Sequence, residues 1–356
     1  MMTAPADIER YRRRRRRRQL WLTGAALLLA CTALVAMTTG AISVSPHDFF
    51  GLFREAPAGL AARVIWYVRL PRLVGAILGG AGFAVAGMVL QAILRNPLAS
   101  PSTLGISQGA AFGAALGIML LSLNDATAGS QGAQLSRCPA LVSLLAFGCS
   151  LATTACIVGL AALRRAGREA IVLAGVALGA FFMAGTTVIQ YFADETQLAA
   201  IVRWSFGDVG RATWPELRVI AVVVAAGTGY FFFQSLWFNA LLAGGEVARS
   251  LGVAVSRLRL CGMVVAAMMT AVIVTFFGVI SFIGLVAPHM ARLLVGEDAR
   301  TLLPLTALIG AVLLLGADLL GRLILAPVVL PAGVVTAFMG TPVFLLLLFG
   351  GRGSWR

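Results

Sequence analysis

Residues 238–252, Phe238-Asn-Ala-Leu-Leu-Ala-Gly-Gly-Glu-Val-Ala-Arg-Ser-Leu-Gly252, form a polar break between two long apolar runs. The break carries Glu246 and Arg249, and its spacing predicts a short amphipathic helix. The apolar side of that helix would be formed by Leu241, Leu242, Val247 and Leu251. A pattern of this kind is also typical of an ordinary loop between helices, so the rest of the chain must decide its role.

The apolar runs belong to a chain of 356 residues, of which 60% are hydrophobic and 12% are charged. A soluble domain normally has about a quarter charged residues and cannot bury so much apolar surface. We therefore expect most of this chain to lie in lipid, where helices satisfy their own backbone polar groups. At about 20 residues per span, the length allows about ten helices. The predicted fold class is an all-α polytopic membrane protein.

Positive charge is concentrated at the start of the chain. The net charge is +14, and Arg10 with the run Arg12–Arg18 supplies eight of the 28 basic residues. Because the run directly precedes the apolar segment Leu20–Met37, we interpret residues 1–18 as an unstructured basic tail in the cytoplasm, and not as a nucleic-acid-binding arm. A signal peptide is the alternative, but the apolar segment is long enough to span and no clear cleavage motif precedes Pro46.

The chain contains no lysine. A Walker A loop needs a lysine on the phosphates, so this chain does not bind ATP in that way, and Schiff-base chemistry is excluded too. The five cysteines have neither a metal-type nor a disulfide-type spacing. His47 and His289, the only histidines, have no motif partner. We therefore predict no catalytic residue, no metal site and no cofactor.

Apolar segments predict ten spans, at about 20–42, 64–94, 103–122, 140–162, 170–192, 215–236, 258–280, 281–294, 302–325 and 333–349. They form one membrane domain over residues 19–350, followed by a short tail at 351–356. An even number of spans places both termini on one side, together with segment 238–252. The loops on that side are richer in arginine, which identifies the cytoplasm by the positive-inside rule.

Motifs spread over residues 64–349 point to a known family. They are Arg69-Leu-Pro-Arg72, Gly80–Gln91, Arg95-Asn-Pro-Leu-Ala99 with Leu104–Ala110, Leu173–Gly179, Gly278–His289 and Leu330–Ala337. Together they resemble the FecCD family, the permease subunits of importers for iron–siderophores, haem and vitamin B12. The resemblance implies the type II ABC importer permease fold in a bacterial inner (plasma) membrane.

The resemblance also implies partners. Two ABC ATPase subunits would bind on the cytoplasmic face, and a periplasmic substrate-binding protein would dock outside. A second permease subunit would complete the pathway, as a homodimer or as a related half. Nucleic acid is not among the implied partners.

Segment 238–252 gains a role from the same resemblance. Its part Glu246-Val-Ala-Arg-Ser-Leu-Gly252 fits the pattern Glu-x-Ala-x-x-x-Gly and is similar to the cytoplasmic coupling loop that sits in a groove of the ATPase. The implied coupling residues are Gly245, Glu246, Ala248, Arg249 and Gly252. We expect Gly245 and Gly252 to permit tight turns.

Three arginines lie near the outer ends of predicted spans. The family implies that Arg69, Arg72 and Arg322 receive carboxylates from the binding protein, which would steer docking by opposite charge. Two alternatives remain open. The side chains could extend to the interface for reasons of solvation alone. Arg322 could instead pair with Asp318, one helical turn earlier.

Two further groups are implied to line or gate the path. Gly167-Arg168-Glu169 aligns with a gate of small hydroxyl residues in the vitamin B12 members of the family, and the charges here leave substrate identity open. Pro331, Gly333 and Thr336 open the last span, and the path is implied to lie between the fifth and tenth spans of both copies. Val329 stands where related permeases often have a Glu, so a contact at the outer edge is in doubt.

The sequence thus predicts the permease subunit of an ABC importer, carrying an iron chelate such as an iron–siderophore. Haem or cobalamin is the alternative cargo. An ion-coupled secondary transporter is the alternative of another class, and it would need acidic residues at mid-membrane, where Asp318 is the one candidate.

Overall fold

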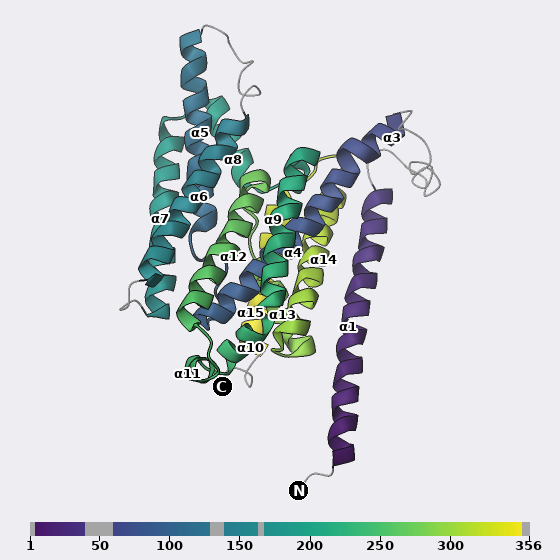
Figure 1. Ribbon diagram of the computed structural model, residues 1–356. Coiled ribbons are helices and arrows are strands. Elements are labelled where there is room, and N and C mark those ends of the chain that lie inside the picture. The colour runs from purple at the N-terminus through teal and green to yellow at the C-terminus, as the bar shows by residue number, and fades with distance from the viewer. Residues whose placement is uncertain (1–3, 40–59, 129–138, 163–166, 351–356) are drawn as a thin grey trace.

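The computed structural model describes residues 4–39, 60–128, 139–162 and 167–350, and the regular structure in these ranges is all helical (Figure 1). The predicted polar segment between the first two spans lies mostly outside the described residues, as does the tail 351–356.

The helices form an up-and-down bundle (Figure 1). In chain order they are α1 (Ala4–Thr38), α3 (Leu60–Val64), the π-helical turn η1 (Ile65–Arg69), α4 (Leu70–Leu94), α5 (Ile106–Ala128), α6 (Pro139–Ala162), α7 (Arg168–Phe192), α8 (Glu195–Ser205), the 3-10 turn η2 (Val209–Arg211), α9 (Trp214–Phe233), α10 (Ser235–Ala243), α11 (Gly245–Ser250), α12 (Val255–Phe277), α13 (Ile283–Val295), α14 (Ala299–Leu323) and α15 (Ala332–Gly350).

The predicted number of spans is confirmed. Among the described residues, seven helices are long and apolar enough to cross a bilayer, and three shorter apolar helices lie at Ile106–Leu121, Ile283–Val295 and Ala332–Leu346. In order, these segments coincide with the ten predicted spans. The eighth span contains Pro288, and α13 continues through it.

The expectation of an unstructured tail at residues 1–18 is wrong for its described part, because α1 is already helical from Ala4. Arginine is a good helix former, and an apolar span that follows directly supplies a preformed helix to extend. The basic run therefore continues the axis of the first span beyond the bundle (Figure 1).

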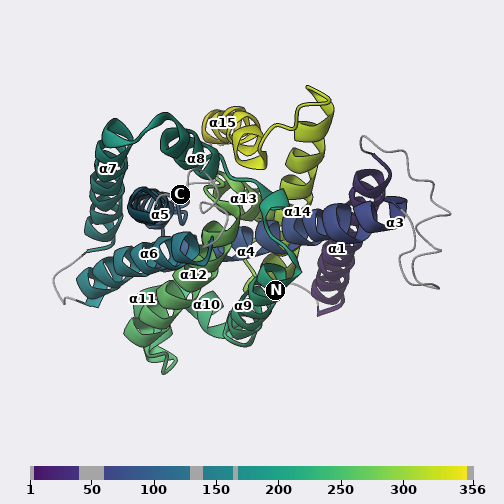
Figure 2. The same cartoon turned by 90° about the horizontal axis from the view of Figure 1, so that it is seen from above.

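Helix α4 lies at the centre of the subunit and packs against α9, α12, α13 and α14 (Figure 2). Glycines make this packing close. A Cβ at Gly87 would overlap the carbonyl of Gly284 on α13, and a Cβ at Gly80 would overlap the carbonyl of Gly310 on α14. In lipid, helices associate through such close packing of small residues, because apolar burial gives no advantage over contact with lipid tails.

The bundle has two ends, which we name after the short helices they carry. The α11 end holds α10, α11, the start of α1 and the start of α14, and the α8 end holds α3, α8 and the end of α14 (Figure 1). Each end carries one of the predicted sites.

Candidate coupling and docking sites

Segment 238–252 is two short helices and not one. Helix α10 ends at Ala243, α11 begins at Gly245, and Gly244 joins them with a φ of +149°. Gly252, with a φ of +81°, ends the segment. L-residues rarely adopt such angles, so Gly244 and Gly252 make the two turns. The expected turn at Gly245 is wrong by one residue, because Gly245 is the first helical residue of α11.

The apolar residues of the segment face two directions. Leu241 is fully buried and Leu242 is half-buried, whereas Val247 is 47% exposed and Leu251 is 63% exposed. The predicted single apolar side is therefore wrong, because the turn at Gly244 rotates α11 relative to α10. Its apolar residues are left uncovered at the α11 end, a feature typical of a surface that another protein covers.

Charged residues flank this exposed apolar surface. Arg249 Nη1 lies 2.5 Å from Glu246 Oε1, and both side chains are exposed. Exposed pairs of this kind contribute about 0–1 kcal/mol, so they have little effect on the fold. Ala248 is fully buried, and α11 contacts α10 and, to a smaller extent, α12. Thus α11 and its C-cap Leu251 present two apolar and two charged side chains.

Asn239 connects α10 to the start of α14. Its amide nitrogen donates to Asp298 Oδ1 at 3.0 Å, and its amide oxygen accepts from the backbone N–H of Ala299 at 2.7 Å. Asp298 is the N-cap of α14 and also accepts from the N–H of Arg300 at 3.3 Å. The first N–H groups of a helix lack partners within the helix, so Asn239 completes the α14 start from a neighbouring element.

Two further contacts join this inner junction to other helices. Arg18 Nη1 on α1 lies 2.7 Å from Asp298 Oδ2. Arg95, at the end of α4, donates from Nη2 to the carbonyl of Leu241 on α10 at 2.7 Å. Helices α1, α4, α10 and α14 therefore meet through four polar side chains. Arg18 belongs to the basic run and Asn239 to segment 238–252, but no sequence pattern predicted that they meet at Asp298.

The pKa of Asp298 lies below its usual value. Burial by itself raises this pKa, but the hydrogen bond from Asn239, the charge of Arg18 and the bonds from Arg300 N–H and Thr301 outweigh it. The carboxylate is consequently charged at neutral pH and holds its three donor elements together.

The three predicted docking arginines lie together at the α8 end. Arg72 Nε lies 2.6 Å from Asp318 Oδ1, and Arg322 Nε lies 3.2 Å from Asp318 Oδ2. Arg72 Nη2 also lies 3.2 Å from Asp208 Oδ1, on the loop before η2. Asp318 is fully buried. The alternative pairing of Arg322 with Asp318 is therefore confirmed, and Asp318 is held by two arginines in a fixed network.

The remaining contacts of these arginines cap the end of α1. Arg69 donates to the carbonyl of Met37 at 2.6 Å, and Arg322 donates to the carbonyls of Ala36 and Thr39 at 3.1 and 3.2 Å. The last carbonyls of a helix lack partners within it and carry its negative dipole end, so cations are favourable there. Arg69 is itself buried, which leaves it inside the subunit.

Other basic residues are exposed at the α8 end. Arg63, Arg203 and Arg218 have exposed side chains, on α3, α8 and α9 respectively. A negatively charged partner that approaches this end meets these three before it reaches the buried network. No motif distinguished them from other arginines in the sequence.

The predicted gate and path residues are not brought together within one subunit. Gly167 caps the start of α7 at the α11 end, Glu169 is exposed beside it, and the side chain of Arg168 lies outside the described residues. Gly333 is at the α8 end and is buried, where a Cβ would overlap the carbonyls of Phe206 and Val279. Its role within this subunit is close packing.

The other two residues of the predicted path also pack within the subunit. Thr336 is buried and donates its hydroxyl to the carbonyl of Gly333 at 2.9 Å, while Pro331 is half-buried.

A model of the FecCD transport family matches residues 26–350 of the chain. The chain belongs to the FecCD transport family. As a FecCD protein it is an ABC importer permease, a multi-pass inner-membrane protein whose family works with ATPase and binding-protein partners. The expected family and fold are confirmed.

Several relatives share most of the FecCD chain. A Methanocaldococcus jannaschii protein, provisionally named as an ABC transporter permease, is 50% identical over 80% of this chain and 81% of its own length. The Yersinia pestis hemin transport system permease HmuU is 36% identical over 94% and 96%. The Klebsiella pneumoniae vitamin B12 permease BtuC is 35% identical over 94% of each chain. The Bacillus subtilis Fe(3+)-citrate permease YfmE is 34% identical over 91% of this chain and 92% of its own length.

A solved structure matches the fold along its length. It is an inward-facing ABC transporter provisionally assigned to the metal-chelate type, with a TM-score of 0.78 at 29% identity, covering 93% of this chain and 99% of that one. The chain thus has the fold of a solved ABC importer, and its cargo has to be inferred from its own residues and its relatives.

Proposed function

We propose that this FecCD permease imports an iron chelate, and that ATPase subunits drive it through α11. The observation that carries the proposal is the exposed surface formed by Glu246, Val247 and Arg249 on α11 and by Leu251 at its C-cap. Apolar anchors rimmed by charge are what a protein groove recognises.

The α11 end is proposed to face the cytoplasm. It carries the basic run of α1 and also Arg95, Arg249, Arg257 and Arg300. Arginine-rich loops remain on the cytoplasmic side during insertion. The start of α1 and the end of α15 lie on that side in this orientation, and the α8 end faces the periplasm.

Movement of α11 would reach the far side of the membrane through α14. A push on α11 acts on α10, and Asn239 passes it to Asp298 at the start of α14. Helix α14 is continuous from Ala299 to Leu323 and carries Asp318 and Arg322 near its other end. A rigid helix with hydrogen-bonded contacts at both ends lets the subunit tilt as one body, as alternating access requires.

The path is proposed to lie between two copies of this chain. Helix α7 leaves one face without a partner in the described subunit, where Leu173, Phe181 and Tyr191 are exposed, and α15 does so at Phe338. A second copy would cover the face of α7 in the proposed homodimer and enclose a passage. Glu169, at the start of α7, would lie at its cytoplasmic mouth.

Iron chelates are the proposed cargo. Haem, vitamin B12 and Fe(3+)-citrate, for which relatives are named, each hold a metal ion in an organic ligand. Two of these three cargoes, haem and Fe(3+)-citrate, contain iron, which supports an iron chelate as the cargo of this chain.

The binding protein is proposed to dock at the α8 end. Arg63, Arg203 and Arg218 are positioned to meet carboxylates first and to speed association. Arg69, Arg72 and Arg322 would support docking from below, because their network fixes the end of α14 on which the partner rests.

The test is uptake in proteoliposomes that contain the permease, its ATPase and its loaded binding protein. Leu251→Ala should lower ATPase assembly and uptake together, because it removes an exposed anchor of α11. Leu144→Ala is the matched control, since Leu144 is similarly exposed at 66% but lies on α6. Equal uptake by both variants, or uptake that persists without ATP, would overturn the proposal.

A further inference from the structure

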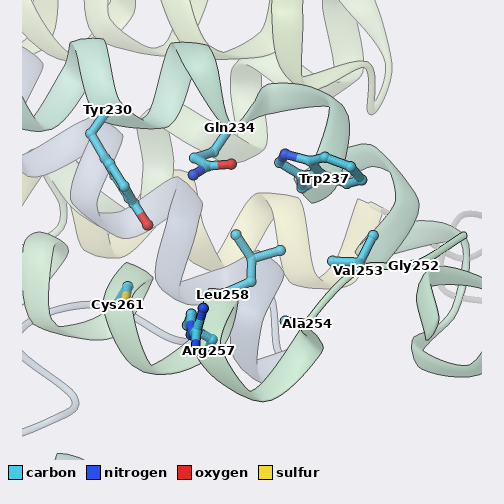
Figure 3. Close-up of a pocket in the computed structure, with 9 residues that line it drawn as sticks. All are labelled: Tyr230, Gln234, Trp237, Gly252, Val253, Ala254, Arg257, Leu258 and Cys261. Atoms are coloured by element: carbon cyan, nitrogen blue, oxygen red, sulfur yellow. The ribbon is translucent and has the colours of Figure 1, made fainter.

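A cavity of about 230 Å³ lies beside the coupling segment, between the junction of α9 and α10 on one side and α12 on the other (Figure 3). Tyr230 on α9, Gln234 at the turn between α9 and α10, and Trp237 on α10 line one side. Arg257, Leu258 and Cys261 line the facing side, and Gly252, Val253 and Ala254 form one end.

The polar groups of this cavity are uncommitted. In the part of the chain that the structure describes, the side chains of Tyr230, Gln234, Trp237 and Arg257 make no hydrogen bond or ion pair with the protein. They offer a phenol O–H, an amide NH₂, an indole N–H and a guanidinium. None of the nine lining residues is acidic. Four donors with one positive charge are suited to bind a phosphate.

The surroundings of the cavity indicate which phosphate. Phe232, Phe233 and Leu236 lie on the neighbouring turns and are all exposed. Trp and Tyr in such a setting are typical of the boundary between membrane and water. Helices α9 to α11 also lie at the edge of the subunit opposite α15, away from the proposed dimer face (Figure 2). At the level of α9, a candidate span, we take this edge to face lipid.

We propose that the cavity binds the headgroup of one anionic phospholipid from the leaflet at the α11 end. Arg257 and the three neutral donors hold the phosphate, Leu258 and Val253 contact the glycerol region, and the acyl chains run along Phe233 and Leu236. Basic pockets between membrane helices on the cytoplasmic side are known to select anionic lipids in this way.

The position of the cavity gives the lipid a consequence for coupling. Gly252, Val253 and Ala254 connect α11 to α12 and also form the end wall. A bound headgroup braces this connection, so the lipid stabilises the position of α11. Only this consequence, and the identity of the leaflet, rests on the proposed function.

Native mass spectrometry of the full-length permease in detergent tests the site directly. Phosphatidylglycerol and phosphatidylcholine with the same acyl chains are titrated in parallel. We expect one phosphatidylglycerol to bind preferentially, and Arg257→Gln to weaken it about fivefold, the effect of one arginine near an anionic headgroup. Arg300→Gln, which removes another exposed arginine of the α11 end, should leave it unchanged.

Other outcomes separate the alternatives. Gln234→Leu should also weaken the binding of phosphatidylglycerol, so this variant provides the test if Arg257→Gln folds poorly. Displacement of the lipid by excess inorganic phosphate would assign the cavity to free phosphate and overturn the lipid site. Equal loss in Arg257→Gln and Arg300→Gln, or no preference for phosphatidylglycerol in the parent protein, would overturn it as well.

Discussion

Asn239 provides the sharpest test of how α11 acts on the bundle. Asn239→Ala removes the bond to Asp298 Oδ1 at 3.0 Å and the bond from Ala299 N–H at 2.7 Å. A bond to a charged group contributes about 1.5–3 kcal/mol and a neutral one about 0.5–1.5 kcal/mol. Because Asp298 is partly exposed, water replaces part of these hydrogen bonds in the variant. We therefore expect the free energy that holds α10 to the start of α14 to fall by an amount near the lower limit, about 2 kcal/mol.

A loss of about 2 kcal/mol changes the balance between attached and detached α10 about thirtyfold. The surface of α11 is untouched, so the ATPase should still assemble with the permease. Stimulation of ATP hydrolysis by the loaded binding protein, measured in proteoliposomes, should fall strongly. Thr23→Ala is the control, because Thr23 bonds only to carbonyls of its own helix.

A second variant checks the physical reason. Asn239→Asp keeps an acceptor for Ala299 N–H but places a carboxylate beside Asp298, where like charges raise the pKa of the introduced carboxyl. That carboxyl regains a donor when protonated, so coupling should recover as the pH falls from 7 towards 5. Normal stimulation in Asn239→Ala, or no pH dependence in Asn239→Asp, would refute the role of this junction.

Three further predictions concern stability, measured by thermal unfolding in detergent. Gly87→Ala should cost about 1–3 kcal/mol, because its methyl group overlaps the carbonyl of Gly284, whereas Gly148→Ala meets open space and should be neutral or slightly stabilising; equal effects would contradict the packing described. Asp318→Asn leaves two arginines without a buried carboxylate and should cost about 3–5 kcal/mol, and a loss no larger than that of the more exposed Asp208→Asn would argue against the network. Because the pKa of Asp298 is lowered, the ionised carboxylate adds to the free energy of unfolding above its ordinary pKa of about 3.9, and this addition is lost as the pH falls through the lower folded pKa. The difference in stability between the parent and Asp298→Asn should therefore stay constant from pH 5 to 8. A difference that disappears within that range would show that the carboxylate is not held as described.

Much of the candidate coupling site could be predicted from residues adjacent in the chain. Glu246, Ala248, Arg249 and Gly252 form a local pattern, and they lie on or beside one short helix. The turn was placed at Gly245 and belongs to Gly244, since both glycines tolerate the required φ and only the packing of α10 selects between them.

The docking arginines show the opposite case. Arg69, Arg72 and Arg322 were expected at one end of the bundle and lie there together. Their inward orientation depends on the carbonyls at the end of α1 and on Asp318 and Asp208, which are far away in sequence. The sequence pattern of an arginine near the end of a span is the same whether its side chain faces a partner protein or caps a neighbouring helix.

The sequence by itself determined that this protein is a membrane bundle of about ten helices, and it placed the candidate coupling segment at 238–252, because hydrophobic length and local motifs are properties of adjacent residues. Only the tertiary structure decided which polar side chains form hydrogen bonds or ion pairs within the protein. The bonds of Asn239, Asp298, Asp318 and the four free donors of the α9–α12 cavity depend on which helices touch, and that follows from glycine-mediated packing that no single segment encodes.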